Sequence, residues 1–221
     1  MRALVTGITS MDGAYLAESL LRDGHEIIGI VRPGRSGLGN VEHLKDDLII
    51  KEASLTNFEF MKSVLRIERP DVIFNLAAIS NYAQYTSDPV GSNQVNGGVP
   101  LILLEAIRQV GPKIRFFQAG SAQVFGNPLT SPQDESTPFS PVTPYSASKA
   151  YAQFVVKQYR DAHGLFASSA ILFNHESPLR PIDFVTRKIT SAVAKIKAGK
   201  ANSLILVNLD VRRDLGFEGD Y

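Results

Sequence analysis

Short apolar runs alternate with amphipathic stretches along most of this chain, and this alternation restricts its fold more than any other feature. Strands are predicted at residues 3–6, 26–31, 48–50, 71–77, 114–119 and 166–173, with a late strand at 204–207. Helical spacing predicts helices at residues 14–22, 57–67, 101–110, 145–163 and 184–198. Continuously apolar strands separated by helices form parallel sheets that are covered on both faces. Because crossovers between parallel strands are right-handed, the predicted fold class is α/β with a doubly wound parallel sheet.

The composition excludes several classes of protein. The chain has 221 residues, and 23 Lys and Arg against 22 Asp and Glu leave a net charge of +1, so no basic field exists for a nucleic-acid backbone. The absence of cysteine excludes disulfides, iron–sulfur clusters and cysteine nucleophiles. No apolar run approaches the ~20 residues of a membrane span, and the apolar stretch at the N-terminus is too short for a signal peptide. We therefore expect a cytoplasmic protein that binds neither nucleic acid nor membranes.

A proline-rich segment at residues 127–144 interrupts the alternation. Its prolines exclude a helix or a central strand, and loops of this length inside a compact domain are usually functional or mobile. Thr143 and Pro144 at its end are typical of an N-cap followed by proline at the first helical position. We therefore expect the next helix to begin at about Tyr145 and to stop at Gly164.

A glycine-containing turn follows the first predicted strand and opens the first predicted helix. The segment reads Thr6-Gly7-Ile8-Thr9-Ser10-Met11-Asp12-Gly13. Glycines in such a turn let backbone N–H groups approach a pyrophosphate at a helix N-terminus, which favours a dinucleotide site over an ordinary strand–helix turn. At the end of the second strand, Arg32 stands where NAD-binding proteins often place an acidic residue. A cation there favours the 2′-phosphate of NADP, and the alternative is an ordinary solvated arginine.

Tyr145 and Lys149 lie four residues apart at the start of a predicted helix, so they share one face. A nearby cation favours a phenolate, which makes a tyrosine usable as a base. Ser121 follows the strand at 114–119 and could hydrogen-bond a substrate hydroxyl held by Tyr145. This order of glycine turn, serine, tyrosine and lysine predicts an alcohol–ketone redox site beside a nicotinamide. The plain alternative is the end of an amphipathic helix.

These segments together resemble the extended short-chain dehydrogenase/reductase family. The resemblance rests on TGITSMDG at 6–13, NLAAIS at 75–80, Ser121 and YSASK at 145–149. Within that family the chain is similar to the GDP-mannose 4,6-dehydratases, through ILFNHESP at 171–178, FVTRKIT at 184–190, Asn208-Leu209-Asp210 and Arg213-Asp214. The resemblance covers nearly the whole chain and implies a Rossmann-like fold.

The resemblance implies a redox-neutral dehydration of GDP-mannose, or a related nucleotide sugar, to its 4-keto-6-deoxy product. NADP would take a hydride from C4 and return it at C6, and no metal is expected. Catalytic roles are implied for Ser121, Gln123, Tyr145 and Lys149. Cofactor contacts are implied for Gly7, Thr9, Ser10, Met11, Asp12, Gly13, Arg32, Leu76, Ala77, Ala78, Tyr145 and Lys149. Substrate contacts are implied for Ser80, Asn174, Val185, Lys188 and Arg213.

The chain departs from the family pattern at several positions, among them Leu179 and Pro181 in the loop after the segment 174–178, and three further departures concern the cofactor and the catalytic residues. Ser10 replaces the middle glycine of the turn, where a side chain crowds the pyrophosphate, and Ser54 replaces an acidic residue near the adenine. Gln123 replaces the glutamate that acts as base and acid for C5 and C6, and a carboxamide cannot exchange a proton at neutral pH. Two alternatives therefore stay open. One is a catalytically impaired NADP-binding homologue, and the other is an NADPH-dependent 4-ketosugar reductase or epimerase.

The resemblance also divides the chain. Residues 1–172 are expected to form an NADP-binding Rossmann-like domain, and residues 173–221 are expected to form part of a smaller substrate-binding region. Because family members continue past residue 221, we expect a chain truncated at its C-terminus, with exposed apolar surface at residues 204–207 and 215–217. The complete protein is expected to form a homo-oligomer, either a dimer or a tetramer.

Overall fold

The computed structural model describes residues 1–206 and 208–221. These residues divide into two compact units, Met1–Leu172 and Phe173–Tyr221, and each unit is described by itself. Within the described residues, no helix has both the length and the apolar character needed to cross a membrane.

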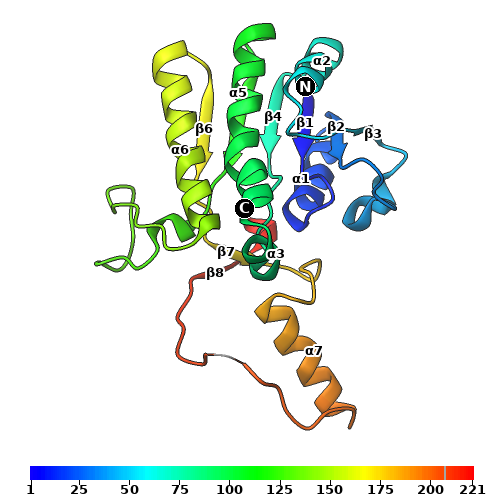
Figure 1. Cartoon of the computed structure of the whole chain (residues 1–221). Helices are drawn as coiled ribbons and strands as arrows, with labels where there is room; N and C mark the ends of the chain where they lie inside the picture. Colours follow the sequence, from blue (N-terminus) through cyan, green and yellow to red (C-terminus); the bar gives the residue numbers. More distant parts are fainter. Residues whose placement is uncertain (207) are drawn as a thin grey trace. The chain divides into compact units, whose positions relative to one another are not determined.

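The first unit is built on one parallel sheet of six strands in the order β3-β2-β1-β4-β5-β6 (Figure 1). The strands are β1 (Arg2–Thr6), β2 (Glu26–Val31), β3 (Leu48–Glu52), β4 (Val72–Asn75), β5 (Arg115–Ala119) and β6 (Ala167–Ala170). The order runs outward from β1 in both directions, which is the mark of a doubly wound sheet. The predicted fold class is therefore confirmed.

Helices cover both faces of this sheet. They are α1 (Met11–Arg22), α2 (Phe58–Glu68), α3 (Tyr82–Ser87), α4 (Pro89–Asn93), α5 (Val99–Val110) and α6 (Pro144–His163), with the short turns η1 (Gly39–Leu44), η2 (Gln94–Gly98) and η3 (Ala122–Phe125). Right-handed crossovers that reverse direction at β1 put α1 on one face and α2, α5 and α6 on the other. In agreement, α2 packs against α5 and α5 packs against α6 (Figure 1).

The main hydrophobic core lies between the sheet and the layer formed by α2, α5 and α6. Leu4, Ile73 and Phe116 contribute to it from the strands, and Met61 and Leu104 contribute from the helices. All of these side chains are at most 2% exposed. Burial of this apolar surface holds the carboxyl ends of the strands in fixed positions, and the candidate site is built on those ends.

Helix α6 begins and ends where its sequence predicts. The Thr143 side chain accepts a hydrogen bond from the Ser146 N–H at 3.0 Å, and Ser146 Oγ accepts the Thr143 N–H at 2.9 Å. This reciprocal pair is a capping box, and Pro144 occupies the first turn, where its missing N–H costs nothing. Gly164 ends the helix with φ of 65°, a left-handed conformation that glycine adopts without a steric penalty.

Two expectations about secondary structure need correction. The strand predicted at 204–207 is wrong, because residues 204–206 form no strand and Val207 lies outside the described residues. Ile205 there is 90% exposed, and no strand of the described residues pairs with residues 204–206. The predicted strand at 166–173 is shorter than expected, because only Ala167–Ala170 pairs with β5.

Residues 82–98 carry helices that the sequence pattern did not indicate. Asn81 and Asp88 cap α3 and α4 through their side chains, and a π-helical turn then leads directly into α5. These pieces are only five or six residues long, too short to show an apolar period. Their caps were readable signals, since Asn and Asp are preferred at helix starts.

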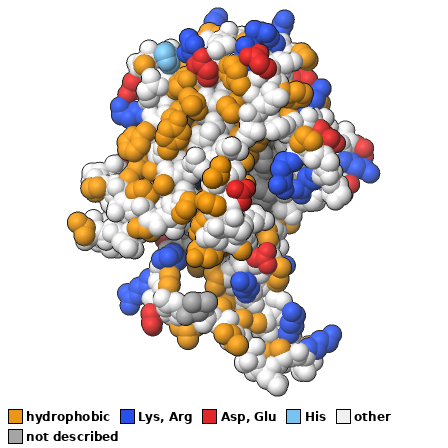
Figure 2. Space-filling view, viewed as in Figure 1, with side chains coloured by type: hydrophobic (Ala, Val, Ile, Leu, Met, Phe, Trp, Pro, Cys, Tyr) orange, Lys and Arg blue, Asp and Glu red, His pale blue; other side chains and the backbone are white. Residues whose placement is uncertain are grey.

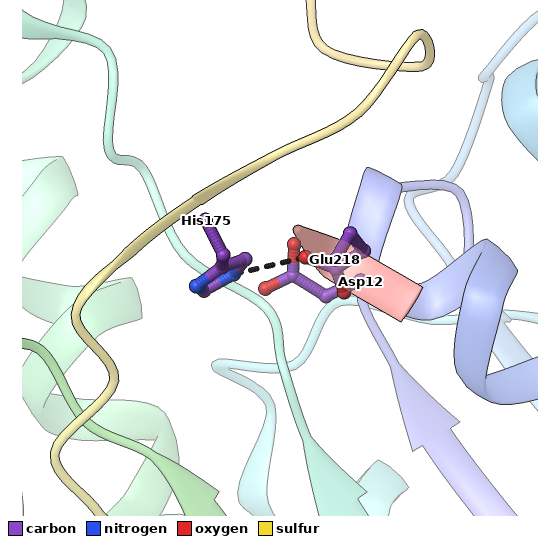
Figure 3. Close-up of side chains that lie close together, drawn as sticks. All are labelled: Asp12, His175 and Glu218. Carbon is purple, nitrogen blue, oxygen red and sulfur yellow. Dashed lines mark ion pairs between the residues drawn. The ribbon is translucent and has the colours of Figure 1, made fainter. Parts of the chain in front are cut away.

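The second unit contains a two-stranded parallel sheet, β7 (Asn174–Glu176) and β8 (Leu215–Phe217), together with α7 (Val185–Lys197) and the short turn η4 (Glu218–Asp220). His175 Nδ1 lies 2.7 Å from the Phe173 carbonyl, and its Nε2 lies 3.1 Å from a Glu218 carboxylate oxygen (Figure 3). No residue of α7 is buried, and apolar and basic side chains share its surface (Figure 2). Leu215 and Phe217 are 53% and 51% exposed, in line with the apolar surface expected at 215–217.

Candidate active site at the carboxyl end of the sheet

The predicted cofactor and catalytic residues of the first unit follow the carboxyl ends of its strands. The glycine turn follows β1, Arg32 follows β2, the segment 76–80 follows β4 and Ser121 follows β5. Strands β1 and β4 are neighbours, and the chain leaves β1 toward β2 on one side but leaves β4 toward β5 on the other side. In doubly wound sheets, ligands bind in the crevice at such a switch point.

The glycine turn is closely packed against the end of β4. Gly7 has φ of +71°, and a Cβ placed there would lie 2.7 Å from the Ala77 nitrogen. A Cβ on Gly13 would lie 2.4 Å from the Gly7 carbonyl oxygen. Both positions therefore require glycine. At Gly7 the reasons are the positive φ and the close approach of Ala77, and at Gly13 the reason is the close approach of the turn itself. The result is a short connection that leads the chain from β1 straight into the N-terminus of α1.

Ser10 has a structural role that the sequence pattern did not indicate. Its Oγ accepts a hydrogen bond from the Gly13 N–H at 2.9 Å, which makes Ser10 the N-cap of α1. Met11 is 3% exposed, so its side chain belongs to the core. Asp12 lies in the first turn of α1, where the helix dipole favours a negative charge.

The region after β2 is exposed and basic. Arg32 and Arg35 are both exposed, and the Arg35 N–H donates to the Arg32 carbonyl at 3.2 Å. Arg35 Nε donates to the Gly37 carbonyl at 3.2 Å. After β3, the hydroxyl groups of Ser54 and Thr56 lie 2.9 Å apart. The structure thus brings two cations to the end of β2.

Tyr145 and Lys149 lie in the first two turns of α6, and the lysine is almost completely buried. Lys149 is 2% exposed, and its Nζ donates to the Ala119 carbonyl at the end of β5 at 2.8 Å. The ammonium lies 5.9 Å from the centre of the Tyr145 ring. Burial lowers the pKa of Lys149 to about 8, and the charge of Asp12 opposes this change. A cation is therefore held beside a phenol in surroundings with little water.

Tyr85 is an aromatic neighbour of this pair that the sequence analysis missed. Its ring stacks on the Tyr145 ring with centroids 5.6 Å apart and an interplanar angle of 22°, and the Tyr82 ring packs edge-on against the Tyr85 ring with centroids 5.4 Å apart. Tyr85 is 5% exposed, and burial, with a smaller contribution from Tyr82, raises its pKa despite a hydrogen bond with Thr143. The stack restrains the plane of the Tyr145 ring.

Ser121 and Gln123 lie at the start of η3. Ser121 Oγ accepts the Gln123 N–H at 3.2 Å, so the serine caps this turn, and the Gln123 side chain is exposed. A hydroxyl that accepts this bond still has its own proton to donate. The Gln123 carboxamide can donate and accept hydrogen bonds, but it cannot take or release a proton.

Three buried polar side chains lie in a row across β1, β4 and β5, near the carboxyl ends of these strands. Thr6, Asn75 and Gln118 are each at most 1% exposed, and none of them was singled out from the sequence. The available signal was the polar residue that interrupts each apolar strand near its carboxyl end. A buried polar side chain needs a partner, and such partners identify networks.

The predicted substrate residues divide between the two units. Ser80 belongs to the first unit and follows β4. Asn174 is exposed on β7, and Val185 and Lys188 are exposed on α7. Arg213 precedes β8, and its Nη1 donates to the Arg212 carbonyl at 2.9 Å.

Comparisons with known proteins find relatives along the whole chain. A family model described as GDP-mannose 4,6 dehydratase matches residues 4–221. The GDP-mannose 4,6 dehydratase of Homo sapiens is 41% identical, over 99% of this chain and 62% of its own length. The GDP-mannose 4,6-dehydratase of Vibrio cholerae is 40% identical, over 100% of this chain and 62% of its own length. The chain thus spans 62% of the length of these relatives.

Solved structures share the fold. The dTDP-glucose 4,6-dehydratase of Bacillus anthracis, solved in complex with NAD, has a TM-score of 0.84 at 25% identity, over 100% of this chain and 68% of that one. The UDP-glucose 4-epimerase of Thermus thermophilus, also a complex with NAD, has a TM-score of 0.84 at 24% identity, over 100% of this chain and 71% of that one. The match over residues 4–221 and the identities of 40% and 41% show that this chain belongs to the GDP-mannose 4,6-dehydratase family.

Proposed function

We propose that this chain carries the cofactor site and the proton-transfer residues of a nucleotide-sugar 4,6-dehydratase that acts on GDP-mannose through NADP. One observation carries the proposal. The ammonium of Lys149, in a side chain 2% exposed, lies 5.9 Å from the Tyr145 ring, beside the end of β5 that leads to Ser121. Membership of the family supplies the reaction class. Because the chain spans 62% of its relatives' length, the activity of the whole protein is part of the proposal.

The residues around the glycine turn fit a dinucleotide phosphate. The turn brings the N-terminus of α1, with its partial positive charge, to the switch point of the sheet. The exposed Arg32 at the end of β2 offers a cation suited to the 2′-phosphate of NADP. When bound, NADP supplies the hydride acceptor and donor for the sugar. Arg32 favours NADP here, although the two solved relatives described above are complexes with NAD.

Ser121, Tyr145 and Lys149 each have a separate role in the proposed reaction. Tyr145 takes the proton of the sugar O4 hydroxyl while C4 is oxidised to a ketone. Lys149 stabilises the phenolate form of Tyr145, since its pKa of about 8 leaves the ammonium charged at pH 7. The Ser121 hydroxyl donates to O4 and orients the sugar. These three groups account for the redox half of the reaction.

The dehydration half also needs a base for the C5 proton and an acid for the C6 hydroxyl. Gln123 occupies the position implied for that role, and it cannot supply either function. General acid–base groups contribute typically 10²–10⁴-fold to a rate. We therefore expect this chain to dehydrate GDP-mannose at least about 10²-fold more slowly than its Gln123→Glu variant.

The test is incubation with GDP-mannose and NADP⁺, with the product identified by its loss of 18 mass units, roughly one water. Wild type, Gln123→Glu and Gln123→Glu/Tyr145→Phe are compared at equal concentration. Gain of product in Gln123→Glu, and its loss again in the double variant, supports the proposal. Equal and rapid turnover in wild type and Gln123→Glu contradicts the assignment of position 123. Absence of product in every variant contradicts dehydration by this chain.

The exposed carboxamide of Gln123 also favours a second candidate, an NADPH-dependent 4-ketosugar reductase or epimerase. Reduction of a ketone needs only Ser121, Tyr145 and Lys149. Oxidation of NADPH by wild type in the presence of a 4-keto-6-deoxy sugar nucleotide distinguishes this function from dehydration. Binding of NADPH without turnover of either substrate instead identifies a cofactor-binding homologue.

A further inference from the structure

Four buried polar side chains lie next to one another beneath the candidate active site. Thr6, Asn75, Gln118 and Lys149 are at most 2% exposed and come from β1, β4, β5 and α6. Thr6 pairs in register with Asn75, and Asn75 pairs with Gln118. They are therefore direct neighbours across adjacent strands. Burial of four polar groups costs free energy unless all are hydrogen-bonded, so their arrangement is specific.

One line of hydrogen bonds joins these side chains. Thr6 Oγ1 donates to Asn75 Oδ1 at 2.5 Å, and Asn75 Nδ2 donates to Gln118 Oε1 at 2.7 Å. Gln118 Nε2 then donates to the Ala119 carbonyl at 2.8 Å. Lys149 Nζ donates to the same carbonyl oxygen, also at 2.8 Å. The last acceptor of the line is therefore shared by an amide and the ammonium.

The direction of donation along this line is fixed by the Ala119 carbonyl, which can only accept. The Gln118 NH₂ group must therefore face this carbonyl, so the Gln118 oxygen faces Asn75 and accepts from its NH₂ group. The Asn75 oxygen then faces Thr6, whose hydroxyl donates to it. The Thr6 oxygen also accepts the Ala77 N–H at 3.2 Å. The side-chain amides of Asn75 and Gln118 thus have one consistent orientation.

We propose that Gln118 is a positioning residue for Lys149: together with Asn75 it holds the Ala119 carbonyl in place and weakens that carbonyl as an acceptor for the lysine ammonium. The catalytic meaning of this role rests on the proposed function, in which Lys149 acts through Tyr145. The state of the lysine itself is measurable without substrate or cofactor. The line begins at the Ala77 N–H, so it also ties Lys149 to a segment implied in cofactor contact.

The physical consequence concerns the balance between the ammonium and the neutral amine. Among the residues that the structure describes, the charged or titratable groups facing Lys149 are Asp12 on α1 and Tyr145 on α6. Burial favours the neutral amine, and Asp12 opposes it. The Gln118 amide donates to the same carbonyl oxygen that accepts the ammonium. This second hydrogen bond weakens the bond to the ammonium, so it favours the neutral amine of Lys149, as burial does. Removal of this donor leaves the oxygen to Lys149 alone and favours the charged form.

The experiment follows the titration of Lys149 by NMR in the full chain labelled with ¹³C,¹⁵N-lysine, with Lys149→Met to assign its signals. Gln118→Met removes the donor without adding a charge, and Gln118→Glu keeps the shape but replaces the donor with a carboxylate oxygen, whose negative charge also favours the ammonium. At pH 8, Gln118→Met is expected to raise the ratio of charged to neutral Lys149 about threefold to tenfold, the factor of one hydrogen bond. Gln118→Glu is expected to raise it at least as much.

The matched control is Asn96→Leu. Asn96 is 1% exposed and makes two hydrogen bonds to the Ile79 backbone, at 2.8 and 3.0 Å, outside the line. Its loss is expected to lower stability without changing the Lys149 ratio. An unchanged ratio in Gln118→Met, or an equal change in Asn96→Leu, overturns the proposal.

Unfolding of both Gln118 variants while Asn96→Leu stays folded would mark Gln118 as purely structural and also overturns the proposal. Failure of the proposed function gives a different result. In that case Gln123→Glu yields no product, yet the Lys149 ratio still changes in Gln118→Met.

Discussion

Lys149 places an ammonium group where water is almost excluded, at 2% exposure. Such burial favours the neutral amine and lowers the pKa of Lys149 to about 8. Because the charge persists at pH 7, the fold keeps a buried cation close to a phenol. A buried ammonium lowers the stability of the fold, and groups with shifted pKa values are common at functional sites. Lys149 therefore both destabilises the fold and takes part in the proposed reaction.

Ser10 combines two opposing effects at one position, and substitutions can separate them. Ser10→Ala removes the hydrogen bond to the Gly13 N–H and is expected to cost about 1 kcal/mol of stability, whereas Ser10→Gly is expected to cost only a few tenths. For cofactor binding we expect a different order, because only Ser10→Gly removes the Cβ that we expect to crowd a pyrophosphate. We expect Ser10→Gly to bind NADPH more tightly than wild type, and Ser10→Ala to show no such gain.

Thermal unfolding followed by circular dichroism measures the first effect, and NADPH fluorescence titration measures the second. Ser10→Ala serves as the control for loss of the hydroxyl alone. If Ser10→Gly binds NADPH no more tightly than wild type, the idea that Ser10 crowds the pyrophosphate is wrong.

At the scale of elements, a carboxylate joins α5 to α6. Glu105 accepts hydrogen bonds from Arg108 at 2.6 and 2.8 Å, and from Tyr159 on α6 at 2.9 Å. The Arg108 guanidinium, together with Gln109 and Tyr159, lowers the pKa of Glu105 to about 2 against the effect of burial. Burial and the Glu105 carboxylate raise the pKa of Tyr159 to about 12, so its hydroxyl remains a donor. The ionised Glu105 carboxylate thus links α5 to α6, and its protonation at low pH removes the charge.

The pH dependence of this contact has a definite sign. Since the folded-state pKa of Glu105 lies below its ordinary 4.5, its stabilisation is present above pH 4.5 and is lost as pH falls toward 2. At pH 7, Glu105→Gln is expected to melt a few degrees below wild type, and this gap is expected to close between pH 4.5 and 2.

Glu59→Gln is the matched control for this experiment. Glu59 pairs with Lys62 at 3.0 Å, but its side chain is 74% exposed, so its loss should change the melting temperature little at any pH. A gap for Glu105→Gln that stays constant from pH 7 to pH 2.5 contradicts the proposed role of this carboxylate.

At the scale of the whole molecule, burial is distributed unevenly. Leu4, Val5 and Ile73 in the central strands are 0% exposed, whereas no residue of α7 is buried. Amides in central strands exchange only when the core opens, while a helix without buried contacts opens locally at little cost. We expect hydrogen exchange measured by mass spectrometry to be slowest in β1 and β4 and to be complete early in α7.

Two segments serve as internal references for this measurement. Helix α6, which has buried residues along its length, should remain protected longer than α7, although both are helices. Protection of α7 equal to that of β4 would show that α7 has a partner surface and contradict this prediction.

Signals between neighbouring residues were enough to predict much of this protein. The β2 strand at Glu26–Val31 is as predicted, and Thr143, Pro144 and Gly164 predicted the limits of α6. The glycine turn was readable because glycine has a conformational meaning of its own, as the φ of +71° at Gly7 illustrates. Residues 204–206 were misread because an apolar run becomes a strand only if a neighbouring strand pairs with it.

Sequence alone therefore determined the α/β class, the caps of α6 and the kinds of chemical group available, because periodicity, capping and turn preferences act over a few residues. Only the tertiary structure decided what those groups meet. The Ala119 carbonyl reaches Lys149, Asn75 reaches Gln118, and Tyr85 stacks on Tyr145 across 30, 43 and 60 positions of the chain. Such contacts depend on the order and register of the strands and on how helices pack over them, and no local pattern of residues encodes these.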